Sequence, residues 1–207
     1  MSTLDGAIAS LVTPGLNTLG FRKRSRGIYT TELAKDILGW IGLNRGTAHM
    51  PAGVADITPV VGVRHQAVER MVADLRGLAF HPYVPPTLGS HIGYVMPERR
   101  YAAWTVDTRG ETASRVVASM IEALKQYGLP YMQASSDLLR LCALLDEDGP
   151  DDQQASYRRP VAWYLAGYPA KARSALEQSL SQLDGRSDPA ATLLRSFADN
   201  LNRLLAA

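Results

Sequence analysis

The residues best suited to binding chemistry are four basic side chains near the start of the chain. They fall within five consecutive positions and form the strongest local charge feature: Arg22, Lys23, Arg24 and Arg26. Such a basic turn can hold a phosphate, a nucleic-acid backbone or an acidic protein surface. In the simpler interpretation it is a solvated turn that keeps the start of a sheet soluble. Tyr29 and Trp40 follow, and aromatic residues beside basic ones form stacking platforms and interface hot spots, although both also suit a core.

Two further arginines, Arg99 and Arg100, complete the candidate binding residues. The four histidines never approach one another at metal-ligand spacing, so we expect no metal and no cofactor: His49, His65, His81 and His91. The last two flank a proline-rich stretch and are the pair that would serve an enzyme using acid–base catalysis. No Gly-x-Ser-x-Gly, Walker or dinucleotide motif occurs, and no catalytic residue is predicted.

Cys142 and the acidic residues favour structural roles. Cys142 is the single cysteine, which excludes an internal disulfide, and the apolar residues around it predict a small buried hydrophobic side chain. Residues 146–152 hold five acids, but without the ligand spacing of a calcium-binding loop. This stretch is typical of an exposed linker.

Composition limits the class of protein. The chain has 207 residues, of which 46% are hydrophobic, as in an ordinary soluble protein. Its formal net charge of +2 is smaller than a dedicated nucleic-acid-binding domain usually carries. The N-terminus does not resemble a signal peptide, and no stretch is apolar enough to span a membrane. We therefore expect a cytoplasmic protein that does not contact membranes.

A hairpin organises the first half of the chain. β-branched and aromatic residues predict strands over Ile28–Leu33 and Ile37–Leu43, and Lys35-Asp36 suits the connection between them. The basic turn precedes the first strand. Apolar residues on both sides of the second strand indicate that both faces of the sheet are covered.

The other elements follow from periodicity and from the positions of proline and glycine. An amphipathic helix is predicted from Leu4 to Leu19, with a kink or break at Pro14-Gly15. A strand over Ile57–Val63 contains Pro59, which indicates an edge position or a bulge. We also expect helices at 64–76, 112–127 and 136–145, a break at Leu129-Pro130, and short strands at 92–96 and 101–106.

The acidic stretch suggests how the chain divides. We predict an α+β domain over residues 1–148, a linker or loop over 149–157, and a helical extension over 158–207 that packs on the first domain. In that extension Asp188-Pro189 is expected to cap the last helix. The predicted fold class is α+β, with an antiparallel sheet of about five strands packed with helices and followed by the C-terminal helical extension.

Two stretches resemble a known family. LVTPGLNTLGFRKRSRGIYTTEL is similar to the opening of the bacterial domain of unknown function numbered 4304, and HIGYVMPERRYAAWTVD, followed by a helix and GLPYM, resembles its second half. The match covers roughly residues 4–145, and Ala103-Trp104 stands where members of that family tend to have two tryptophans. The resemblance implies bacterial origin and an α+β fold, and it brings no catalytic residues with it.

These observations favour a non-enzymatic protein-binding module over an enzyme. In a concrete form the module is an immunity or defence-accessory protein that occludes a toxin or nuclease. The alternative is a binder of nucleic acid or a phosphate ligand through the basic turn, whose affinity would fall steeply with salt. A third hypothesis is an enzyme of unrecognised type.

Overall fold

The computed structural model describes residues 4–147 and 154–206, and it confirms the α+β fold with an antiparallel sheet. The chain forms two compact units, and each is discontinuous in sequence. The first comprises Met1–Arg64 and Gly89–Ala134, and the second comprises His65–Leu88 and Ser135–Ala207. This division differs from the predicted one, in which residues 149–157 separate the domains. Residues 149–153 lie outside the described part of the chain, and residues 155–157 already belong to a helix.

The first unit is built on the sheet, whose strands run in the order β1-β2-β3-β4-β5, with β6 also paired to β4. Their bounds are β1 Arg22–Ser25, β2 Ile28–Ala34, β3 Ile37–Gly46, β4 Val54–His65, β5 Leu88–His91 and β6 Trp104–Asp107. The predicted hairpin is confirmed as β2 and β3, which are antiparallel and joined at Lys35-Asp36. Asp36 adopts a positive φ of 61°, which suits an aspartate in a tight turn.

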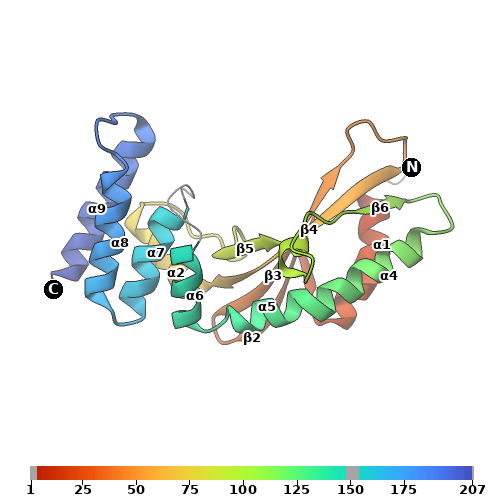
Figure 1. Ribbon diagram of the computed structural model, residues 1–207, viewed down its shortest axis with the longest axis horizontal. Helices are drawn as coiled ribbons and strands as arrows, with labels where there is room; N and C mark the ends of the chain where they lie inside the picture. The colour runs from red at the N-terminus through yellow and green to blue at the C-terminus, as the bar shows by residue number, and fades with distance from the viewer. Residues whose placement is uncertain (1–3, 148–153, 207) are drawn as a thin grey trace. The chain divides into compact units, whose positions relative to one another are not determined.

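One face of the sheet is covered by helices α1 (Leu4–Thr18), α4 (Ala113–Ala123) and α5 (Leu129–Ala134) (Figure 1). Tyr29 and Ile41 are cross-strand partners on this face, and both are buried. The hydroxyl of Tyr29 lies 2.9 Å from that of Thr13 in α1. Because side chains alternate along a strand, this face and its helices hold the apolar core of the unit.

Three predicted elements of the first unit are wrong in type or place. The basic stretch is mostly a strand, β1, because Arg22 and Lys23 pair with Thr30 and Tyr29 of β2. Residues 92–95 form a short helix, α3 (Ile92–Val95), directly after β5. The predicted strand over Ile57–Val63 is confirmed within β4, but an edge position is wrong, because β4 lies between β3 and β5. Pro59 lies just beyond Ile57, the last residue that pairs with β6.

Two expected helix breaks do not occur. Helix α1 continues through Pro14, and the close approach of Ile121 from α4 to Gly15 explains the glycine, since a Cβ there would lie 2.8 Å from that side chain. Helix α4 runs into α5 through a π-helical turn, η1 (Leu124–Gly128). This wider turn carries the chain past Leu129-Pro130, where an α-helix was expected to end.

The second unit is helical. Its described helices are α2 (Gln66–Leu75), α6 (Leu138–Glu147), α7 (Ala155–Leu165), α8 (Pro169–Ser181) and α9 (Pro189–Leu205). Helix α7 lies at the centre and packs on the other four. Glu69 of α2 and Arg158 of α7 form a buried ion pair, with 2.7 Å between Oε1 and Nε. Tyr157 packs edge-on against Phe197 of α9. The predicted helical extension therefore also contains α2, which precedes it by some eighty residues in the sequence.

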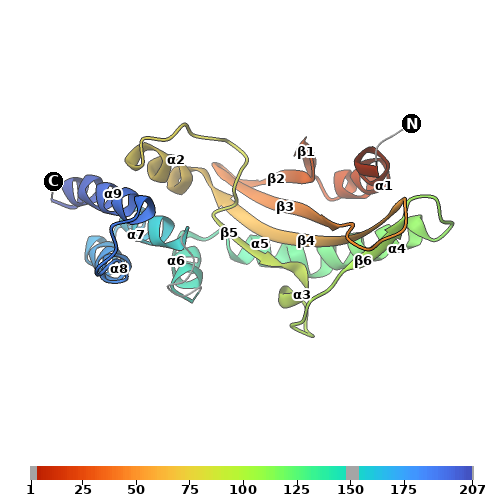
Figure 2. The ribbon, with the colours of Figure 1, turned by 90° about the horizontal axis from the view of Figure 1, so that it is seen from above.

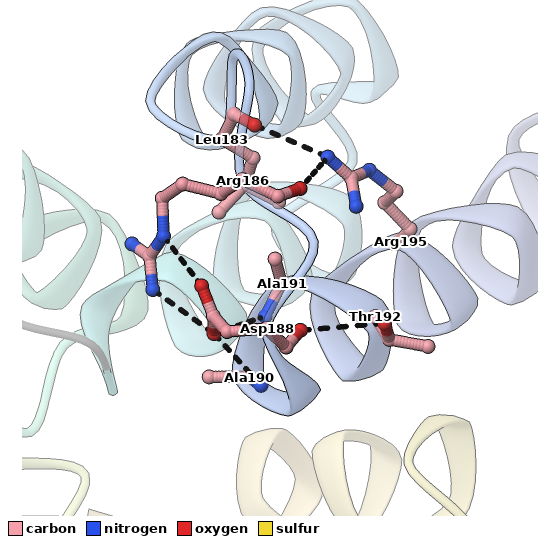
Figure 3. Close-up of polar contacts among 7 residues, drawn as sticks. All are labelled: Leu183, Arg186, Asp188, Ala190, Ala191, Thr192 and Arg195. Carbon is pink, nitrogen blue, oxygen red and sulfur yellow. Dashed lines mark hydrogen bonds and ion pairs between the residues drawn. The ribbon is translucent and has the colours of Figure 1, made fainter.

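Helix α9 begins at the predicted cap (Figure 3). Oδ1 of Asp188 accepts hydrogen bonds from the backbone N–H groups of Ala190 at 3.1 Å and Ala191 at 3.2 Å. Arg186 donates to both oxygens of the same carboxylate. This hydrogen bonding with Arg186, followed by that from the Ala191 N–H, lowers the pKa of Asp188 to about 2.

Candidate functional site

The predicted basic residues lie at one edge of the sheet. All four residues of β1 are exposed, and β1 has a sheet neighbour on one side. Arg24 donates from Nε to the hydroxyl of Thr30 at 2.8 Å, so its stem lies along β2. Arg26 forms an ion pair with Asp5 of α1, which also pairs with Arg45. Of the four basic residues, Arg26 therefore ties the turn after β1 to α1, and Arg24 lies against β2.

The two aromatic candidates beside them are buried. Tyr29 belongs to the core described above, and Trp40 of β3 is only 7% exposed. The six-membered ring of the Trp40 indole lies close to Gly42, where an added Cβ would come within 2.3 Å of it. Both residues support the sheet from within, and neither presents a ring face on which a base could stack.

Arg99 and Arg100 do not join the basic residues of β1. They follow α3, which continues directly from β5, at the opposite edge of the sheet from β1 (Figure 2). Four strand-to-strand steps separate β1 from β5, or ~19 Å at the usual spacing between strands. The six basic candidates thus form two surfaces at opposite edges, and the two aromatic candidates, Tyr29 and Trp40, belong to neither.

The surface around Arg99 and Arg100 also displays two tyrosines. Tyr94 is 55% exposed and Tyr101 is 62% exposed, which is unusual for such large apolar rings. We call Tyr94, Arg99, Arg100 and Tyr101 the tyrosine–arginine surface. Tyrosine and arginine are among the residue types that dominate protein-binding hot spots.

A cavity of about 380 Å³ opens on this surface. Its walls combine apolar side chains with one charge of each sign: Met96, Ala102, Ala103, Glu98 and Arg100. Gly93 also lines it, and the backbone N–H of Arg100 donates to the Gly93 carbonyl at 3.1 Å. A Cβ on Gly93 would lie 2.1 Å from the Arg100 carbonyl oxygen, so the cavity depends on this glycine.

His91 anchors the two tyrosines. Its ring stacks on Tyr101 with 4.8 Å between centroids and meets Tyr94 edge-on at 5.6 Å. Nδ1 accepts from the backbone N–H of Gly93, so the neutral ring carries its proton on Nε2. Nε2 is buried and has no hydrogen-bond partner among the described residues. Burial lowers the pKa of His91, which keeps the ring neutral and suited to packing.

The other titratable candidates have local structural roles. His81 lies in the second unit, where its Nδ1 accepts from the backbone N–H groups of Tyr83 and Val84. Nε2 of His65 donates to the Ser135 carbonyl at 3.1 Å, and burial lowers the pKa of this histidine. Cys142 is fully buried, and that burial raises the pKa of its thiol to about 12. Within residues 4–147 and 154–206, no three His, Cys, Asp or Glu side chains gather as metal ligands.

Tyr94, Tyr101 and His91 are the functional candidates that sequence reasoning missed as binding residues. The sequence signal that could have indicated them is their closeness in the chain to Arg99 and Arg100, since His91 and Tyr94 precede the two arginines and Tyr101 follows them directly. Their exposure could not be inferred, because the short helix α3 decides which way each ring points.

Comparisons with family models, with curated proteins and with solved structures gave no match to this chain. The resemblance to the domain of unknown function numbered 4304 therefore stays a prediction. In the described part of the chain, every helix is too short or too polar to cross a bilayer.

Proposed function

We propose that this chain is a protein-binding module that uses the tyrosine–arginine surface. The observation that carries the proposal is the pair of exposed tyrosines, Tyr94 and Tyr101, which pack on His91 beside a cavity that Tyr101 helps to line. Rigid aromatic rings bury a large area on binding and lose little conformational entropy. The cavity beside them suits one apolar side chain of a partner.

The charges of the surface indicate the kind of partner. Arg99 and Arg100 are exposed beside the tyrosines, and Glu98 is the one acid of the cavity wall. Arginine recognises carboxylates with paired hydrogen bonds. The partner is therefore a protein with an apolar anchor residue flanked by acidic side chains.

The most specific form of the proposal is a bacterial, cytoplasmic immunity or defence-accessory protein that occludes a toxin or nuclease. A nuclease presents a basic groove to its substrate, and two basic surfaces repel each other. Of the two possible targets, a toxin with an acidic surface therefore agrees better with Arg99 and Arg100 than a nuclease does.

Affinity capture from the native host tests the proposal. Three baits are compared: wild type, Tyr94→Ala/Tyr101→Ala, and a control, Leu139→Ala/Leu193→Ala, that removes exposed apolar side chains elsewhere. We expect one partner with the wild type and the control, and loss of about 2 kcal/mol of binding free energy, roughly 30-fold in affinity, with the tyrosine variant. Equal capture by all three baits would refute the proposal.

The second candidate function is binding of nucleic acid or a phosphate ligand through β1. It is favoured by the exposure of Arg22, Lys23 and Arg24 in one strand, and it is weakened by the burial of Trp40. If it holds, single-stranded oligonucleotides bind with an affinity that falls steeply with salt, and Arg22→Glu/Arg24→Glu abolishes binding while Arg115→Glu on α4 does not. Absence of binding at low ionic strength dismisses it.

A further inference from the structure

A polar cavity of about 280 Å³ lies in the helical unit, apart from the surfaces described above. It is lined by residues of three helices, all within that unit. Helix α6 contributes Asp146, α7 contributes Arg159 and Trp163, and α8 contributes Lys171, Ser174 and Gln178. Polar and charged groups thus dominate its walls.

Arg159 is the unusual member of this wall. It is only 4% exposed, and one terminal nitrogen donates to the hydroxyl of Ser179 at 3.4 Å. Its Nε is buried and has no hydrogen-bond partner among the described residues. A guanidinium carries five N–H donors, and leaving them unpaired in the interior costs free energy. The cavity is where an oxygen acceptor can reach this group.

Lys171 places a second cation at the same cavity. Its Nζ lies 4.0 Å from the centroid of the Trp163 ring, so a cation–π contact holds it over the indole. The indole N–H in turn donates to Oδ1 of Asp146 at 3.3 Å. The charged residues of the wall are therefore two cations and one carboxylate, which leaves one positive charge uncompensated within the described lining.

We propose that this cavity binds a small oxyanion, a phosphate or carboxylate group, between Arg159 and Lys171. Ser174 and Gln178 supply neutral donors from α8. The volume is slightly smaller than that of most ligand pockets, so it suits a single phosphate group or a small organic acid and excludes a whole nucleotide. This site is independent of the tyrosine–arginine surface, which belongs to the other unit.

Titration of the full chain at constant ionic strength tests the site. Inorganic phosphate and acetate are the two probes, and the indole N–H resonance of Trp163, assigned with Trp163→Phe, is the readout. We expect a saturable shift with at least one probe, and affinity roughly tenfold weaker in Lys171→Met, which removes one charged hydrogen-bond donor. The matched control is Arg173→Met, an exposed cation of the same helix that donates to the Leu205 carbonyl.

The probe that saturates the site identifies the kind of ligand. Saturation by phosphate alone identifies a phosphate-type ligand, and saturation by acetate alone identifies a carboxylate. No saturation with either probe up to about 20 mM, well above millimolar dissociation constants, overturns the proposal. It is also overturned if Lys171→Met and Arg173→Met bind the probe equally well.

Discussion

The ion pair between Glu69 and Arg158 joins α2 to α7 inside the helical unit. Both side chains are more than nine-tenths buried, and Arg158 donates to both carboxylate oxygens, at 2.7 and 3.4 Å. Two buried charges in good geometry offset each other's desolvation, whereas one of them alone does not. The pair therefore fixes which face of α2 meets α7.

Removing one partner of this pair is predicted to be costly. Glu69→Gln leaves the Arg158 guanidinium buried without its counter-charge, and we expect the free energy of unfolding to fall by about 3–5 kcal/mol. Urea denaturation measures it. The control is Glu69→Met/Arg158→Met, which removes both charges and should recover most of the loss. A single variant as stable as the wild type would contradict the assigned role.

The thiol of Cys142 is predicted to be inert until the protein unfolds. An exposed thiol ionises near pH 9, but burial raises the pKa of Cys142 to about 12. Between these values the unfolded state releases a proton that the folded state keeps, so this thiol lowers stability as pH rises from 9 towards 12. We expect no reaction with a thiol reagent at pH 8 without denaturant, and a shallower alkaline loss of stability in Cys142→Ala. Rapid labelling of the native protein would show that the site is open.

At the scale of elements, short segments position the tyrosine–arginine surface. Helix α3 spans only Ile92–Val95, and its first turn is capped by Nδ1 of His91. Arg99 then adopts a φ of 45°, which turns the chain back so that Arg100 and Tyr101 face α3. The surface is therefore a product of local backbone geometry.

Gly93→Ala is predicted to disrupt this segment. The new Cβ would meet backbone atoms of Arg100 and Ala102 at 2.1 and 2.8 Å, and such overpacking costs about 1–3 kcal/mol. Thermal unfolding and partner capture should both show the loss. Gly46→Ala is the matched control, because its nearest contact would be an ordinary 3.8 Å to Asp56. If Gly93→Ala matches this control, the cavity does not depend on close backbone contact.

The cap of α9 gives a prediction about pH. Asp188→Ala removes the acceptor for two backbone N–H groups and the partner of Arg186, so the melting temperature should fall by a few degrees. Because the pKa of Asp188 is lowered to about 2, its contribution is complete above pH 4 and is lost as pH falls through 2. Melting curves of the wild type and the variant should converge over that range. A constant difference down to pH 2 would contradict the assignment.

At the scale of the whole molecule, sequence periodicity predicts the elements that depend on local pattern. The β2–β3 hairpin, the amphipathic helices and the Asp188 cap follow from residue spacing alone. Strand β1 does not follow from residue spacing, because Arg and Lys have no strong preference for strands. It is a strand because it pairs with β2. Helix α3 does not follow from spacing either, because four residues with β-branched members read equally well as a strand.

The division into units is also beyond local pattern. The chain passes between the units after residues 64, 88 and 134; the proline-rich stretch before residue 88 is typical of a connection, but the sequence around residues 64 and 134 is not. The positions of these crossings depend on tertiary packing, since α2 packs on α7 and α9 and so belongs to the helical unit. The cavity of the helical unit brings together residues of three helices, so local pattern does not predict it. The lining of the other cavity spans only residues 93–103, but the turn that exposes the two tyrosines has no signature in the sequence.

The most direct test of the central claim is photo-crosslinking in the native host from Ala103, which lines the cavity of the tyrosine–arginine surface. A benzoylphenylalanine replaces Ala103 in one strain and the exposed Leu193 in another. We expect a discrete adduct with one protein from position 103 and none from position 193. No adduct from position 103, or the same adduct from both positions, would contradict it.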